Sequence, residues 1–126
     1  MGKFVIKDAK NGVKFDLKAS NGQVILSSEI YSSIAGCKNG IASVQKNAPI
    51  AALEDQTVEG FEKEKHPKFE VYVDKAGEFR FRLKATNGEI IGVSESYKAK
   101  TSCLNGIDSI RKNSVDAEIE DIRENA

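Results

Sequence analysis

Apolar and polar residues alternate along two stretches of the chain, which predicts two β-strands that each bury one face. In residues 13–19 every second residue is apolar and the residues between them are charged, and residues 79–85 repeat this pattern. An Asn-Gly pair follows each stretch and favours the positive φ angles of a two-residue hairpin turn. The return strands are expected at residues 24–26 and 90–91, and the first strands at residues 3–7 and 68–73.

The apolar period changes from that of a strand to that of a helix after Tyr31. Ile34, Cys37, Ile41 and Val44 lie at helical spacing, and Cys103, Ile107 and Ile110 repeat it. Ser32 or Ser33 is expected to cap the first helix. Asn47 and Asn113 suit the left-handed residue that often follows a helix. A last short strand is expected at residues 51–55 and again at residues 117–122.

The chain therefore contains one β-β-β-α-β unit twice, because residues 13–55 recur as residues 79–121. We assign the units to residues 1–55 and 68–126, with a charged linker at residues 56–67. A unit of this size buries only ~60% of its unfolded surface and is marginal alone. We therefore expect an α+β fold in which both units form one antiparallel sheet with both helices on one face. A pseudo-twofold axis would relate the units.

The repeated motifs resemble those of the YegP-like family of small bacterial proteins. They are S-E-x-Y, C-x-N-G-I-x-S-[VI]-x-K-N and the hairpin F-x-L-K-A-x-N-G, and the resemblance covers nearly the whole chain except the linker. It implies a single antiparallel sheet in which the units exchange their C-terminal strands. Residues 51–55 would then lie in the second unit's part of the sheet, and residues 117–122 in the first's. The resemblance implies no activity, cofactor or catalytic residue.

Composition narrows the classes of function. The chain carries 19 basic and 19 acidic residues, so it lacks the basic excess typical of dedicated nucleic-acid binders. The apolar runs are too short to span a bilayer, and the first residues lack the features of a signal peptide. We therefore expect a cytoplasmic protein with no membrane partner.

Cys37, Cys103 and His66 are weak candidates for chemistry. The cysteines do not form a C-x-x-C pair and both fall on the apolar helical face, so we expect buried, reduced thiols. A disulfide across the pseudo-axis would require Cα atoms within about 7 Å. His66 has no nucleophile recognisable beside it, and the common nucleotide, zinc and hydrolase motifs are absent. We expect a non-enzymatic protein with no metal and no cofactor.

The S-E-x-Y motifs form two equivalent polar candidates where strand passes to helix. Their residues are Ser28, Glu29 and Tyr31 in the first unit, and Ser94, Glu95 and Tyr97 in the second. An anion could bind there at a helix N-terminus, or the enzyme alternative could use a Glu together with a Tyr hydroxyl. We favour a local role, in which Ser and Glu satisfy amides at the helix start and Tyr packs.

A stripe of cations on the middle strands is the sharper binding candidate. It consists of Lys14, Lys18, Arg80, Arg82 and Lys84, on the sheet face expected to lie opposite the helices. A weak nucleic-acid partner or another anionic partner could bind this stripe. Cross-strand ion pairs with acidic residues explain it without a ligand, and we favour that interpretation.

We therefore expect a binding or accessory module of unknown partner, with a protein and a weakly bound nucleic acid as the alternatives. We expect a monomer, with a dimer as the alternative. Gly40 and Gly106, which fall inside the expected helices, indicate that something packs closely against each helix.

Overall fold

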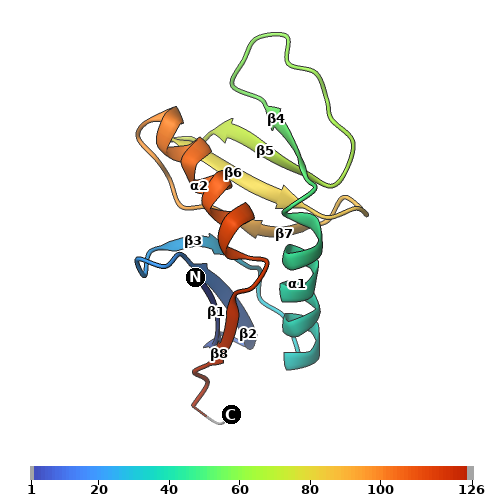
Figure 1. The fold of residues 1–126 in the computed structure, drawn as a ribbon, viewed down its shortest axis with the longest axis vertical. Helices are drawn as coiled ribbons and strands as arrows, with labels where there is room; N and C mark the ends of the chain where they lie inside the picture. The colour runs from blue at the N-terminus through green and yellow to red at the C-terminus, as the bar shows by residue number, and fades with distance from the viewer. Residues whose placement is uncertain (1, 125–126) are drawn as a thin grey trace.

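The fold is that of a computed structural model, which describes residues 2–124 (Figure 1). The first unit contains β1 (Lys3–Ala9), β2 (Gly12–Lys18), β3 (Val24–Ser27), α1 (Ile34–Asn47) and β4 (Ala52–Asp55). The second contains β5 (Lys68–Val73), β6 (Phe79–Lys84), β7 (Ile90–Val93), α2 (Lys100–Asn113) and β8 (Glu118–Asp121). The predicted α+β fold of two β-β-β-α-β units is confirmed. None of the described helices is long and apolar enough to cross a membrane.

All eight strands form one sheet in the order β4-β5-β6-β7-β3-β2-β1-β8. The predicted exchange of C-terminal strands is confirmed, because β4 pairs with β5 and β8 pairs with β1. Both of these edge pairings are parallel, whereas the pairings between them are antiparallel. The expectation of a wholly antiparallel sheet is therefore wrong at the two edges. Hairpins force antiparallel pairing only on strands joined by short turns, and each edge strand reaches its neighbour from the far end of a helix.

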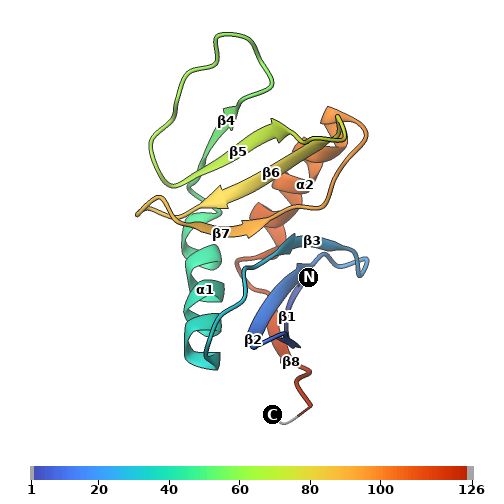
Figure 2. The ribbon, with the colours of Figure 1, turned by 180° about the vertical axis from the view of Figure 1, so that it is seen from behind.

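Both helices cover the same face of the sheet, as the two opposite views show (Figures 1 and 2). Helix α1 contacts β2 of its own unit and β7 of the other, and α2 contacts β6 and β3 in the same way. The two units therefore share one core. Its largest fully buried apolar side chains are Phe4, Phe15, Phe69, Phe81, Ile6, Leu17, Leu26, Ile41, Leu83, Ile110 and Val44.

The units meet where β3 lies beside β7, and Ser27 opposite Val93 is the strand pairing there. Leu26 and Gly92 occupy equivalent positions in the repeat and face each other across this seam. A Cβ at Gly92 would lie 2.5 Å from Cγ of Leu26, which is fully buried. The pseudo-twofold symmetry is therefore broken at this seam, because the Leu26 side chain occupies the space that a side chain at position 92 would need.

Two local expectations differ from the structure. Only the glycine of each Asn-Gly pair has a positive φ, and Ala19 N–H donates to Gln23 O while Gly22 N–H donates to Ala19 O. The turn is therefore a three-residue loop closed by a glycine bulge. Asn47 does not follow α1 in a left-handed conformation but ends it, and its side-chain amide donates to Ser43 O. Asn113 does the same in α2.

The helix glycines do mark a close approach. A Cβ on Gly40 would overlap the Tyr31 hydroxyl and lie 2.7 Å from Tyr31 Cζ. The Tyr31 ring in turn stacks on Phe15, with ring centroids 6.2 Å apart. Gly106 receives Tyr97 in the equivalent way in the second unit. The tyrosine of each S-E-x-Y motif is therefore wedged between sheet and helix.

Candidate functional site

The serines of the S-E-x-Y motifs hold the backbone of a neighbouring strand. Ser28 Oγ accepts a hydrogen bond from Phe15 N–H at 2.9 Å and donates to Glu29 O at 2.7 Å. Ser94 makes the same contacts with Phe81 and Glu95. These serines do not cap the helices. Ser33 caps α1, as one of the two predicted caps, whereas Ala99 at the start of α2 has no side-chain cap.

The glutamates of the two S-E-x-Y motifs face solvent, whereas the tyrosines pack against the helices. Glu29 and Glu95 are exposed and line a hollow of about 370 Å³ at the seam, together with Arg80. Tyr31 and Tyr97 are not among the residues that line it, because their hydroxyls lie against the helix glycines. Burial raises the pKa of both tyrosines. A carboxyl and a tyrosine hydroxyl therefore do not converge on one cavity in the described residues.

The cations of the middle strands mostly face carboxylates. Arg80 pairs with Asp74 at 2.8 Å, whereas Arg82 and Lys84 share Glu70 at 2.5 and 3.2 Å. Lys14 lies 4.0 Å from Asp16. Lys18 makes no ion pair among residues 2–124. Cross-strand pairing thus accounts for most of this stripe, and Lys18 stands apart.

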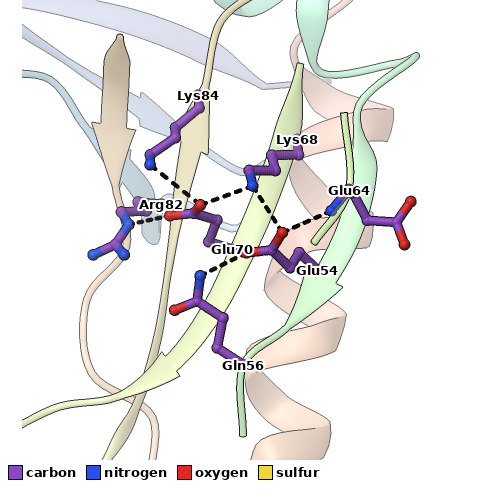
Figure 3. Close-up of polar contacts among 7 residues, drawn as sticks. All are labelled: Glu54, Gln56, Glu64, Lys68, Glu70, Arg82 and Lys84. Atoms are coloured by element: carbon purple, nitrogen blue, oxygen red, sulfur yellow. Dashed lines mark hydrogen bonds and ion pairs between the residues drawn. The ribbon is translucent and has the colours of Figure 1, made fainter. Parts of the chain in front are cut away.

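The open face of the second unit contains a buried charged cluster (Figure 3). Lys68 Nζ lies 2.7 Å from Glu54 Oε1 and 3.2 Å from Glu70 Oε2. Glu54 also accepts hydrogen bonds from the Gln56 side chain at 2.6 Å and from Glu64 N–H at 2.8 Å. Both ends of the linker therefore reach the cluster, because Gln56 and Glu64 each donate a hydrogen bond to Glu54.

These contacts control the protonation of the cluster. Burial opposes ionisation of Glu54, but hydrogen bonds from Lys68, Gln56 and the Glu64 amide outweigh it and lower its pKa to about 2. Burial likewise opposes the charge on Lys68, and its bonds to Glu54 and Glu70 nevertheless raise its pKa. The cluster is thus fully ionised near neutral pH.

The other end of the sheet, where β8 pairs with β1, carries the same ion pair in an open setting. Register identifies Lys3 and Glu120 as the equivalents of Lys68 and Glu54, and their charged atoms lie 2.9 Å apart. The side chains of Lys3 and Glu120 are 48% and 49% exposed, whereas those of Lys68 and Glu54 are 7% and 1% exposed. No described segment donates a backbone hydrogen bond to Glu120 as the linker does to Glu54.

Two further positions of this surface differ between the units. Val5 on β1 stands where β5 has Glu70, and Ile122 follows β8 at the position where Gln56 follows β4. Val5 and Ile122 line a hollow of about 330 Å³ together with Lys3, Lys18 and Glu120. Ala19, Ser20 and Gly22 of the β2–β3 loop also line it. The hollow beside β8 thus has the same Lys–Glu pair as the buried cluster, but its pair is exposed and its wall is more apolar.

The other candidate residues remain apart from this hollow. Cys37 and Cys103 are free and fully buried, and burial raises the pKa of Cys103 to about 11. His66 is exposed and lies near Gly88. Within residues 2–124 no group of three or more His, Cys, Asp or Glu residues is placed to hold a metal ion.

A family profile described as "Domain of unknown function (DUF1508)" matches residues 8–55 and again residues 74–121. The chain belongs to the DUF1508 family. Each match covers most of one structural unit, so one DUF1508 repeat corresponds to one β-β-β-α-β unit.

Relatives of DUF1508 type occur with two units and with one. The chain is 47% identical to the UPF0339 protein YegP of Yersinia pestis over 97% of its own length and 96% of the relative's. It is 56% identical over 55 residues to a UPF0339 protein of Treponema denticola, a match that spans 95% of that relative. The solution NMR structure of a UPF0339 protein from Shewanella oneidensis superposes with a TM-score of 0.79 at 36% identity. That match covers 97% of this chain and 92% of the other.

Sequence reasoning did not single out Lys3, Val5 or Ile122. The signal was a difference between the two DUF1508 repeats, namely Val5 against Glu70 and Ile122 against Gln56. Each difference replaces a polar side chain by an apolar one on the open face. The two repeats align at an offset of 65 residues before the β5–β6 turn and 66 after it, so the sequence contains this signal once the one-residue insertion in that turn is allowed for.

Proposed function

We propose that this protein is a non-enzymatic binding module that receives an extended segment of a partner protein beside β8. One observation carries the proposal. The Lys–Glu pair that the linker buries at β4 recurs at β8 with both side chains half exposed. The edge that a chain segment covers in one unit is therefore available to a partner in the other.

The chemistry of the β8 edge supports a segment of protein chain as the occupant. Strand β8 lies at the end of the sheet, so its outer backbone groups face no further strand. The apolar side chains of Ile119 in β8 and of Ile122 just after it are 49% and 53% exposed. Unpaired strand edges and exposed apolar side chains are the features by which sheets accept extended peptides.

The placement of the polar candidates supports a non-enzymatic role. Ser28 and Ser94 hold strand backbone, and the tyrosines pack against helix glycines. The sheet-face cations Lys14, Arg80, Arg82 and Lys84 face carboxylates, which leaves little uncompensated charge for a nucleic acid.

Peptide selection on the full chain tests the proposal. We expect displayed peptides to be enriched that bind the wild-type protein and lose affinity for Ile122→Arg. Val73→Arg is the matched control, because Val73 is similarly exposed at 49% and lies in β5, toward the opposite end of the sheet from β8. Amide shifts of the bound state should fall in β1, β8 and residues 18–22.

Selected peptides that bind Ile122→Arg as well as Val73→Arg would contradict the proposal. So would amide shifts confined to the helices or to the seam between the units.

A further inference from the structure

We infer that the hollow between β1, β2 and β8 binds a carboxylate side chain carried by the partner segment. This inference rests on the proposed function and specifies the chemistry of the same surface. The strand pairs differ at this point, because Glu70 on β5 faces Arg82 on β6, whereas Val5 on β1 faces Asp16 on β2. Strand β5 thus carries a carboxylate beside Lys68 that β1 lacks beside Lys3.

The second unit shows how such a carboxylate is held. Glu70 Oε2 lies 3.2 Å from Nζ of both Lys68 and Lys84, which stand directly opposite each other on β5 and β6. Its other oxygen pairs with Arg82, a position that Asp16 occupies in the first unit. Lys3 and Lys18 stand opposite each other on β1 and β2 in the same register. The first unit thus retains both lysines and lacks the acid between them.

The two lysines have hydrogen-bonding capacity left for an incoming acid. An ammonium group carries three donors. Lys68 uses its donors on two carboxylates, whereas Lys3 is paired only with Glu120 and Lys18 with no acid among the described residues. A carboxylate placed between them would form charge-assisted hydrogen bonds to both.

The neighbouring charges permit this anion. Asp16 stands opposite Val5, but it is buried and already engaged by Lys7 at 2.6 Å and by the Ser27 hydroxyl at 2.7 Å. The hollow of about 330 Å³ has Val5 and Ile122 in its wall. A carboxylate on an apolar stem, such as a glutamate side chain, matches both the lysines and the wall.

We assign the incoming carboxylate to an extended peptide because a segment of the chain, the linker, contacts the equivalent Lys–Glu pair at β4. At β4 the linker donates Glu64 N–H to Glu54. A partner segment beside β8 would donate a backbone N–H to Glu120 in the same way and place its own acid over Lys3 and Lys18. A free carboxylic acid would lack the backbone contact.

The test uses a capped peptide with the sequence of residues 60–66, Gly-Phe-Glu-Lys-Glu-Lys-His, titrated into the full ¹⁵N-labelled chain. We expect saturable amide shifts at Val5, Lys18 and Glu120. Replacing both peptide glutamates by glutamine should weaken binding about tenfold, as should Lys18→Met in the protein. Lys75→Met, at an exposed lysine of the β5–β6 turn, is the matched control and should bind unchanged.

A second variant places an acid in the hollow from within the chain. Val5→Glu should prevent peptide binding because its own carboxylate occupies the lysines, whereas the uncharged Val5→Gln should still bind. N-acetylglutamate methylamide tests the free acid as the source. It should need at least about tenfold higher concentration than the peptide to shift the same amides, because it lacks the extended backbone.

The outcomes separate this inference from the proposed function. Equal affinity for the glutamate and glutamine peptides, or an unchanged affinity in Lys18→Met, overturns the carboxylate site and leaves peptide binding at β8 standing. Equal affinity for peptide and N-acetylglutamate methylamide overturns the assignment to a peptide segment. The absence of saturable shifts in β1, β2 and β8 overturns both.

Discussion

Gly40 lies in the middle of α1. An alanine at this position should stabilise the protein through its higher helix propensity and destabilise it through a steric clash. Alanine is favoured over glycine by about 1 kcal/mol in a helix interior. The added Cβ would overlap the Tyr31 hydroxyl and lie 2.7 Å from Tyr31 Cζ and 3.1 Å from Phe15 Cε2. Ordinary carbon contacts lie at about 3.5–4.0 Å, so the tyrosine ring must move by roughly 1 Å.

The surroundings of Tyr31 make that movement costly. Its ring is stacked on Phe15, which is fully buried against the sheet, so the ring cannot retreat toward the core. Overpacking of this kind costs about 1–3 kcal/mol. Subtracting the gain in propensity, Gly40→Ala should lower the free energy of unfolding by up to about 2 kcal/mol.

Urea denaturation followed by far-ultraviolet circular dichroism measures this free energy. Gly36→Ala in the same helix is the matched control, because its Cβ would meet its nearest neighbour, Ser33 Oγ, at 3.4 Å. That variant should be stabilised by up to about 1 kcal/mol. The propensity gain is common to both alanines, so they should differ by the overpacking cost of about 1–3 kcal/mol.

The second unit and a double variant extend the test. Gly106→Ala should cost less than Gly40→Ala, because its Cβ would lie farther from the tyrosine, at 2.6 Å from Tyr97 Oη and 3.1 Å from Cζ. In a Tyr31→Ala background, Gly40→Ala should cease to destabilise. The reasoning is refuted if Gly40→Ala stabilises the wild-type protein as much as Gly36→Ala does.

Three further expectations follow from the seam, the buried cluster and the thiols. Gly92→Ala should lower the free energy of unfolding by about 1–3 kcal/mol in urea, because its Cβ meets Leu26; unchanged stability would show that the seam is loosely packed. The pKa of Glu54 is about 2 in the folded protein and 4.5 ordinarily, so its contribution of about 3 kcal/mol is present above pH 4.5 and is lost as pH falls toward 2. Acid titration of stability should be shallower in Glu54→Gln, and an identical slope would contradict this. Ellman's reagent at pH 8 should modify Cys37 and Cys103 only after unfolding, because burial raises the pKa of both thiols; rapid reaction of the native protein would refute it.

The local elements of each unit could be predicted from sequence because their causes are local. Alternation in residues 13–19 predicts a strand from the geometry of the extended backbone, and β2 lies there. The helical spacing of Cys37, Ile41 and Val44 places these residues on the buried face of α1. Gly40 indicated a close approach, although the tyrosine that makes it lies nine positions earlier and could not be identified from spacing.

The candidate site is harder to predict than the fold. The sequence pattern groups five cations on one face of the sheet but does not show which of them face carboxylates. Four of the five cations selected from the pattern face carboxylates, and only Lys18 lines the proposed site. Lys3 and Ile122 come from opposite ends of the chain. They meet only because β8 pairs with β1.

The sequence alone determined that the β-β-β-α-β unit is repeated, and its apolar pattern predicted the strands, the helices and the shared core. Only the tertiary structure decided that the edge pairings are parallel and that equivalent ion pairs have different surroundings. Lys68–Glu54 and Lys3–Glu120 have the same residue types in the same register, yet the side chains of one pair are almost fully buried and those of the other half exposed. The physical reason is that burial depends on which distant segment packs over a side chain. Glu64 of the linker reaches Glu54, and no described segment reaches Glu120 in that way.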